Sequence, residues 1–218
     1  MSAPPRSRPA ATPRARPVPD PIRPAVGPAG GVAAVILAAG RSRRFGAVKQ
    51  LALLEGRTLL EHVITVAADS GLRPIVVVVP IWLRPPDTAE EAVLWVRNPY
   101  PERGMSYSLR LGFAALPAGA RAATILLGDQ PTLPRANIEA VIRGRGTRPI
   151  VAAWADQRPA PPVLIERSHF AAVVEASGDR GLRDLLLARP RWVAAVAVPF
   201  HPPDVDTPGD LAALDAGE

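Results

Sequence analysis

The chain alternates short, continuous apolar runs with segments in which apolar residues recur at helical spacing. Residues 32–38 read Val-Ala-Ala-Val-Ile-Leu-Ala, and such a run is typical of a strand buried on both faces. Residues 59–68 instead place Leu60, Val63 and Ile64 on one side of a helix. By the same criteria we expect strands at residues 32–38, 74–80, 92–96, 123–127, 150–153, 163–165 and 193–198. We expect helices at residues 59–68, 106–116, 135–143, 168–176, 180–188 and 208–214.

This alternation of strands and helices predicts an α/β fold. Repeated strand–helix units build a three-layer sandwich, in which helices cover both faces of a mostly parallel, Rossmann-like sheet. Ligands of such sheets bind beyond the carboxyl ends of the strands. Residues that directly follow a predicted strand are therefore the first candidates for a functional site.

Residues 1–30 differ in composition from the rest of the chain. They are rich in Pro, Arg and Ala, and proline at that density excludes a helix or an interior strand. We expect a disordered extension at residues 1–30 and one folded domain at residues 31–218. The chain has a net charge of +6, and Asp20 is the one acid among the arginines of the extension. Because this segment lacks interleaved aromatic residues, we interpret it as a solvated tail.

The composition also excludes several classes of function. The chain has no cysteine, so disulfides, thiolate metal sites and a cysteine nucleophile are excluded together. That is compatible with the cytoplasm, where we expect the protein to act. No apolar run approaches the roughly 20 residues that span a bilayer, and the N-terminus has no apolar signal core. We therefore expect neither a membrane nor a nucleic acid among its partners.

The loop after the first predicted strand combines small residues with positive charge. It reads Leu-Ala-Ala-Gly-Arg-Ser-Arg-Arg-Phe-Gly at residues 37–46 and continues to Lys49. Small residues let backbone N–H groups approach an anion, and a triphosphate would relieve the repulsion among Arg41, Arg43, Arg44 and Lys49. The loop has neither a Walker A motif nor the Gly-x-Gly-x-x-Gly of a dinucleotide site, which speaks against a redox enzyme. It predicts a phosphate-binding loop, with an ordinary solvated loop as the alternative.

Two acidic segments could supply ligands for a divalent cation. Asp129 follows the predicted strand at residues 123–127, and Asp206 lies in Asp-Val-Asp-Thr-Pro-Gly-Asp at residues 204–210. Mg²⁺ typically binds one or two carboxylates together with substrate phosphates. A turn aspartate and a helix cap are the alternatives at these positions. With the cationic loop, the two acids provide what an in-line displacement at phosphorus requires.

These segments resemble the NTP-transferase family that includes the molybdenum cofactor cytidylyltransferases. The similar motifs occur in family order at residues 37–51, 98, 104–112, 127–131, 178–181 and 204–208. Together they span nearly everything outside the extension. The resemblance implies a fold of the nucleotide-diphospho-sugar transferase type. It also implies an enzyme that moves a nucleoside monophosphate from an NTP onto a phosphorylated acceptor and releases pyrophosphate.

The resemblance further implies roles for individual residues. Arg44 and Lys49 would bind the triphosphate, with Lys49 neutralising charge at the α-phosphorus, and Asp129 would complete the catalytic set. Asp129 and Asp206 would hold Mg²⁺. The implied nucleotide-binding residues are Leu37, Ala38, Ala39, Gly40, Arg44, Lys49, Gly104, Met105 and Ser106.

The identity of both substrates is inferred from few positions. Ala39, Ser42 and the Asp-Gln-Pro at Asp129 resemble the cytidylyl branch, which favours CTP over GTP and molybdopterin as the phosphorylated acceptor. A client molybdoenzyme would be a further partner. Residues 160–162 read Ala-Pro-Pro where family members often carry Gly-His-Pro, which leaves the acceptor open. The alternatives are a guanylyltransferase, transfer to a sugar or polyol phosphate, and a non-catalytic cofactor-binding chaperone.

Overall fold

The computed structural model describes residues 31–40, 42, 44–46, 48–85, 93–146, 148–175 and 181–216. The predicted extension at residues 1–30 lies outside these residues, as do Arg41, Arg43 and most of the motif at residues 178–181.

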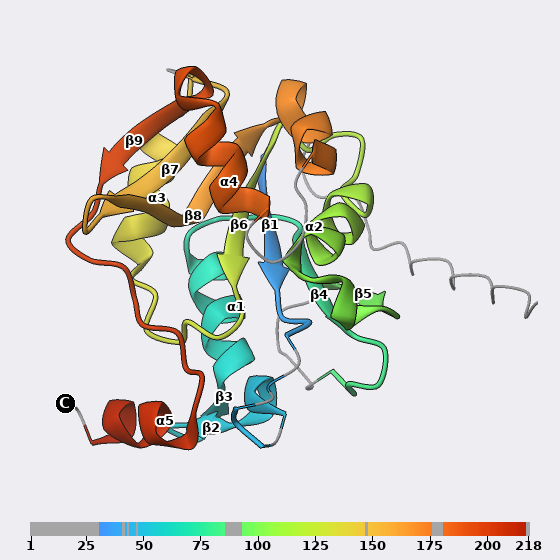
Figure 1. Ribbon diagram of the computed structural model, residues 1–218, viewed down its shortest axis with the longest axis vertical. Coiled ribbons are helices and arrows are strands. Elements are labelled where there is room, and N and C mark those ends of the chain that lie inside the picture. The colour runs from blue at the N-terminus through green and yellow to red at the C-terminus, as the bar shows by residue number, and fades with distance from the viewer. Residues whose placement is uncertain are drawn as a thin grey trace, which may run out of the picture.

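A seven-stranded sheet forms the middle of the molecule (Figure 1). Its strands, in spatial order, are β5 (Val93–Asn98), β4 (Ile75–Pro80), β1 (Val32–Leu37), β6 (Ala122–Leu127), β8 (Arg158–Glu166), β7 (Ile150–Ala155) and β9 (Val193–Ala197). All neighbouring strands are parallel except at β8, which runs antiparallel to both β6 and β7. The expectation of a mostly parallel sheet is therefore confirmed.

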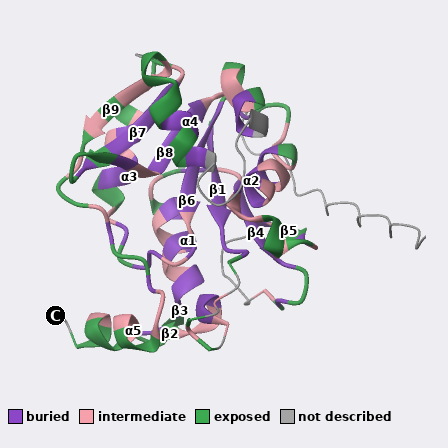
Figure 2. Ribbon diagram, viewed as in Figure 1, coloured by how far each residue is buried: buried purple, intermediate pink, exposed green. Residues whose placement is uncertain are grey.

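Helices cover both faces of this sheet and complete the three layers. On one face, α1 (Leu59–Asp69) and α3 (Arg135–Arg143) pack against alternate residues of the central strands. On the other face, α2 (Met105–Ala114), α4 (Gly181–Ala188) and the 3-10 helix η3 (Arg167–Glu175) pack against the intervening residues. All residues of β1 and β4 are buried, as expected for strands covered on both sides, and Figure 2 shows the same burial at the centre of the molecule.

A third, smaller cluster lies beside the carboxyl ends of the central strands. It joins the hairpin of β2 (Leu53–Leu54) and β3 (Arg57–Thr58) to α5 (Pro208–Asp215). Leu54, Leu59 and Val205 are its buried members. The hairpin was not expected from the sequence, because a strand of two residues is too short to show periodicity.

Two further differences concern local structure. Residues 167–175 form a 3-10 helix where an α-helix is predicted, and three short 3-10 helices occur in loops: η1 (Lys49–Leu51), η2 (Pro101–Arg103) and η4 (Pro190–Trp192). Strand β8 begins at Arg158 and thus includes prolines that were expected to lie in a loop. Its pairing with β6 stops at Val163, so these prolines lie where β8 pairs only with β7.

Among the residues described, no helix has the length and apolar character needed to cross a membrane.

Candidate active site

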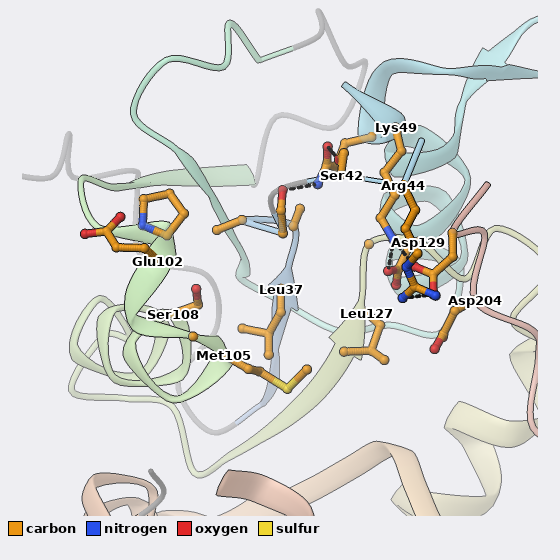
Figure 3. A pocket seen from close by; sticks show the side chains of 18 residues that line it. Leu37, Ser42, Arg44, Lys49, Glu102, Met105, Ser108, Leu127, Asp129 and Asp204 are labelled. Carbon is orange, nitrogen blue, oxygen red and sulfur yellow. Dashed lines mark hydrogen bonds and ion pairs between the residues drawn. The ribbon is translucent and has the colours of Figure 1, made fainter. Parts of the chain in front are cut away.

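A cavity of about 590 Å³ opens at the carboxyl ends of β1 and β6. These two strands are paired in register up to Leu37 and Leu127, so the segments that follow them start side by side. In Figure 3, Lys49 and Arg44 reach toward Asp129 from one side, while Glu102, Met105 and Ser108 lie on the opposite side. The lining residues are Leu37, Ala38, Ala39, Gly40, Ser42, Arg44, Lys49, Gln50, Pro101, Glu102, Gly104, Met105, Ser108, Leu127, Gly128, Asp129, Asp204 and Asp206.

Lys49 is the central cation of this cavity. It begins the 3-10 helix η1, and only 6% of the residue is exposed. Its Nζ lies 2.7 Å from Oδ2 of Asp129 and 2.9 Å from Oδ1 of Asp206. Burial lowers the pKa of Lys49, but the charges and hydrogen bonds of the two aspartates outweigh this and raise that pKa above its ordinary value. The lysine is therefore a fixed positive charge at any physiological pH.

Asp206 is held in place by the start of helix α5. Thr207 caps this helix, its hydroxyl accepting from the N–H of Asp210, and Oδ2 of Asp210 accepts from the N–H groups of Asp206 and Thr207 at 2.9 and 2.7 Å. Those two N–H groups and the Thr207 hydroxyl lower the pKa of Asp210. Arg44 donates to Oδ2 of Asp206 over 2.8 Å, although most of the Arg44 side chain is exposed. The cap of α5 is thus Thr207 and not Asp206, whose carboxylate lines the cavity directly before the helix.

The loop after β1 is shaped by a buried glutamine. Gln50 is 1% exposed, and its Nε2 donates to the carbonyl of Gly40 over 3.2 Å. Its Oε1 accepts from the hydroxyl of Ser42, also over 3.2 Å. The amide therefore holds the predicted phosphate-binding loop at two points, the backbone of Gly40 and the side chain of Ser42.

The opposite wall is formed where η2 meets α2. Gly104 connects them with a φ of 80°, a conformation that favours glycine because it lacks a Cβ. Met105 lines the cavity as expected, whereas Ser106 is 1% exposed and does not line it. Ser108, two residues after Ser106, lines the cavity instead and accepts a hydrogen bond from Nδ2 of Asn98.

The sequence did not predict that Asp204 lines the cavity or that Gln130 binds it. Asp204 lines the cavity, and its Oδ1 accepts from Nε2 of Gln130 over 2.9 Å. Although the residue as a whole is exposed, desolvation of its carboxyl group in the cavity, followed by the charges of Asp129 and Asp206, raises the pKa of Asp204. The signals present in the sequence were the Asp-x-Asp spacing and the adjacency of Gln130 to Asp129.

Two carboxylates converging on one point are a suitable donor set for Mg²⁺ only if substrate phosphates or water complete its shell. Asp129 and Asp206 do converge on one point, since each has a carboxylate oxygen within 3 Å of the same atom, Lys49 Nζ. In the part of the chain that the structure describes, no group of three or more His, Cys, Asp or Glu residues could hold a metal by itself. The donor set therefore fits a metal that enters with a phosphate ligand.

A cationic loop facing paired carboxylates at the carboxyl ends of parallel strands defines a site for transfer chemistry on a nucleotide. A family model described as "MobA-like NTP transferase domain" matches residues 34–193. The chain belongs to this family, and the nucleotidyltransferase domain expected from its motifs is thereby confirmed.

Known proteins resemble this chain to different extents. The 2-C-methyl-D-erythritol 4-phosphate cytidylyltransferase of Streptomyces avermitilis is 37% identical over 123 residues, which cover 50% of this chain and 48% of that enzyme. The matched region thus spans about half the length of that relative. Purine catabolism protein PucB of Bacillus subtilis is 28% identical over 195 residues, covering 80% of this chain and 91% of that protein.

Solved structures confirm the fold type. Rv0371c from Mycobacterium tuberculosis H37Rv superposes with a TM-score of 0.73 at 26% identity, covering 87% of this chain and 100% of that one. A second structure of Rv0371c is a complex with manganese and superposes with a TM-score of 0.70.

Proposed function

We propose that the protein is a magnesium-dependent cytidylyltransferase that moves CMP from CTP onto a phosphorylated pterin, molybdopterin. The main support is a single arrangement: Lys49 Nζ lies between Asp129 and Asp206 in a cavity bordered by the cationic loop. A cytoplasmic location belongs to the same proposal, and the absence of cysteine is compatible with it.

In the proposed reaction, a terminal phosphate oxygen of the acceptor forms a bond to the α-phosphorus of CTP. The bond from that phosphorus to the oxygen bridging the α- and β-phosphates breaks, and pyrophosphate leaves. A phosphate nucleophile is already anionic, so the residues need to supply positioning and charge rather than a base. When bound, Mg²⁺ would neutralise charge on the phosphates.

The residues of the cavity would divide this work between them. Asp129 and Asp206 would hold the metal, while Lys49 and Arg44 would turn from these carboxylates to the triphosphate. The backbone of residues 37–40 would hold the nucleoside. Gly104 and Met105, from the start of α2, would form the base pocket, whereas Ser106, which the resemblance implied for the same pocket, does not line the cavity.

CTP is favoured as donor by two independent observations. The Streptomyces relative is named as a cytidylyltransferase, and Ala39, Ser42 and Gln130 resemble the cytidylyl branch. The acceptor rests on the motif resemblance. The name of the same relative contains a polyol phosphate, so transfer to a sugar or polyol phosphate is the second candidate. GTP as donor and a client molybdoenzyme as partner are further points to test.

Pyrophosphate release tests the proposal. The full-length protein is incubated with Mg²⁺ and each NTP in turn, with molybdopterin, methylerythritol phosphate or no acceptor. We expect release with CTP and molybdopterin, and its loss in the Asp129→Asn variant at an unchanged melting temperature. Equal or better use of GTP would refute CTP as the donor. Release with methylerythritol phosphate but not with molybdopterin would refute molybdopterin as the acceptor. Turnover that survives Asp129→Asn would refute the metal assignment, whereas cofactor binding without any turnover would favour a chaperone.

A further inference from the structure

The segment that carries Asp206 into the site has no helix or strand of its own. Residues 198–206 connect β9, at one edge of the sheet, to α5 on the other side of the site (Figure 1). Three of these residues, Pro199, Pro202 and Pro203, lack a backbone N–H donor. The position of Asp206 must therefore depend on bonds that other parts of the chain make to this segment.

Two buried amide side chains provide three of these bonds. Nδ2 of Asn137, in the first turn of α3, donates to the carbonyl of Phe200 over 3.1 Å. Nε2 of Gln130 donates to the carbonyl of Pro202 over 3.3 Å and to Oδ1 of Asp204 over 2.9 Å. The two residues are 1% and 4% exposed, respectively, and among the described residues neither Asn137 Oδ1 nor Gln130 Oε1 has a hydrogen-bond partner.

Gln130 is the anchor nearest to the chemistry. It follows Asp129 directly in the chain, and the residue that it binds, Asp204, is two positions before Asp206. The carbonyl of Asp129 also accepts from the N–H of Val205 over 2.9 Å, and the Val205 side chain is fully buried. The two proposed metal-binding carboxylates are therefore joined by a short bridge of hydrogen bonds, and Gln130 forms its side-chain part.

We propose that Gln130 is a positioning residue that fixes Asp206 relative to Asp129, so that both carboxylates face Lys49 Nζ. This inference rests on the proposed function, because it assigns Gln130 to the same metal site. Without the Gln130 amide, the carbonyl of Pro202 and Oδ1 of Asp204 would lose their donor, and residues 202–206 could move away from β6. Residues that orient metal ligands typically change metal affinity about 10- to 100-fold when they are replaced.

The test compares Gln130→Met with Asn137→Leu in the full-length protein. Both changes replace a buried amide with an apolar side chain of similar size, and both remove a hydrogen-bond donor to the same segment. The carbonyl that Asn137 binds, however, belongs to Phe200, six residues before Asp206. If Gln130→Met does not fold, Gln130→Leu also removes the donor and adds no charge.

The first readout is hydrogen–deuterium exchange of the peptide that contains Val205 and Asp206. We expect at least tenfold faster exchange of these amides in the Gln130 variant than in the wild type and in Asn137→Leu. Equal protection in all three proteins would overturn the positioning role, and this result does not depend on any activity.

The second readout is Mn²⁺ binding, measured from the electron paramagnetic resonance signal of free Mn²⁺ in the presence of CTP. We expect the dissociation constant to rise about tenfold or more in the Gln130 variant and to stay near the wild-type value in Asn137→Leu. An equal rise in both variants, or none in the Gln130 variant, would contradict the inference. Failure of the wild type to bind Mn²⁺ would instead contradict the proposed function, while the exchange experiment would still decide what Gln130 does.

Discussion

Lys49 is the residue on which the geometry of the site depends most directly. Its ammonium group contacts carboxylates that are 80 and 157 residues away in the chain. It occupies the point on which both proposed metal ligands converge, so the proposed function requires it to move when a metal and a triphosphate bind. In the proposed reaction its ammonium group would contact the carboxylates first and the phosphates later, and this exchange would depend on its fixed positive charge.

Replacing Lys49 with Met removes that charge. We predict that kcat falls about 10²- to 10³-fold, the usual loss for one group that stabilises transition-state charge. Arg145→Met is the matched control, because Arg145 pairs with Glu166 next to the amino end of β6, away from the site. Steady-state kinetics with CTP measure the effect. An unchanged kcat in Lys49→Met, or an equal loss in Arg145→Met, would contradict the role of Lys49.

Asp204 gives a prediction about pH. Burial raises its pKa, as do the charges of Asp129 and Asp206, so its ionised form destabilises the folded protein above that raised pKa. This cost begins to shrink as the pH falls through the raised pKa. It is absent below the ordinary carboxyl pKa of 3.8, where both the folded and the unfolded states bind the proton. Asp204→Asn should therefore raise the melting temperature at pH 7, and the gain should shrink on acidification. Calorimetry from pH 7 to pH 4 tests this, and a gain that grows on acidification would refute it.

Among the secondary-structure elements, α2 connects the cavity wall at Gly104 and Met105 to the core on one face of the sheet. It can lie close to β1 and β4 because residue 112 is glycine. A Cβ at Gly112 would lie 2.5 Å from Cγ1 of Val35 and 3.1 Å from Cγ2 of Val78, and both valines are fully buried. The position of α2, and with it that of Gly104 and Met105, thus depends on the close contact of the Gly112 backbone with Val35 and Val78.

Gly112→Ala should consequently destabilise the protein by about 1–3 kcal/mol, the usual cost of overpacking a core. Gly119→Ala is the control, because nothing lies within 4 Å of its added Cβ, and its free energy of unfolding should change by less than about 0.5 kcal/mol. Urea unfolding measures both values. Equal stability of the two variants would show that α2 can move away from the sheet without cost.

The elements also show what the sequence can and cannot predict. The buried strands were predictable because a strand covered on both faces is apolar throughout, as β1 and β4 are. Asp129 was predictable as a candidate site residue because it lies two positions after the end of β6. That Ser108 rather than Ser106 lines the cavity was not predictable, because it depends on the rotation of α2 about its axis relative to the sheet. The role of Gln130 depends on a loop that returns to it more than 70 residues later.

Over the whole molecule, the described residues form one sheet whose two faces are covered and whose carboxyl edge carries the cavity. The cavity is lined from four separate regions of the chain, namely the loop after β1, the start of α2, the end of β6 and the segment before α5.

The sequence predicts that residues 1–30 contribute nothing to this architecture. A chain that begins at Gly31 should keep the melting temperature and the kcat of the full-length protein, because every residue of the cavity lies beyond that position. Thermal unfolding and CTP turnover of both forms test this. A lower melting temperature of the shorter chain would show that the extension packs on the domain.

The central claim is that Asp129 and Asp206 bind one divalent cation opposite Lys49. The most direct measurement is a crystal structure with Mn²⁺ and a CTP analogue that carries a methylene group between the α- and β-phosphates. The account predicts one anomalous peak within about 2.3 Å of oxygens of both aspartates, with Lys49 Nζ on a phosphate oxygen. A peak elsewhere, or Lys49 still paired with both carboxylates beside the bound nucleotide, would contradict it.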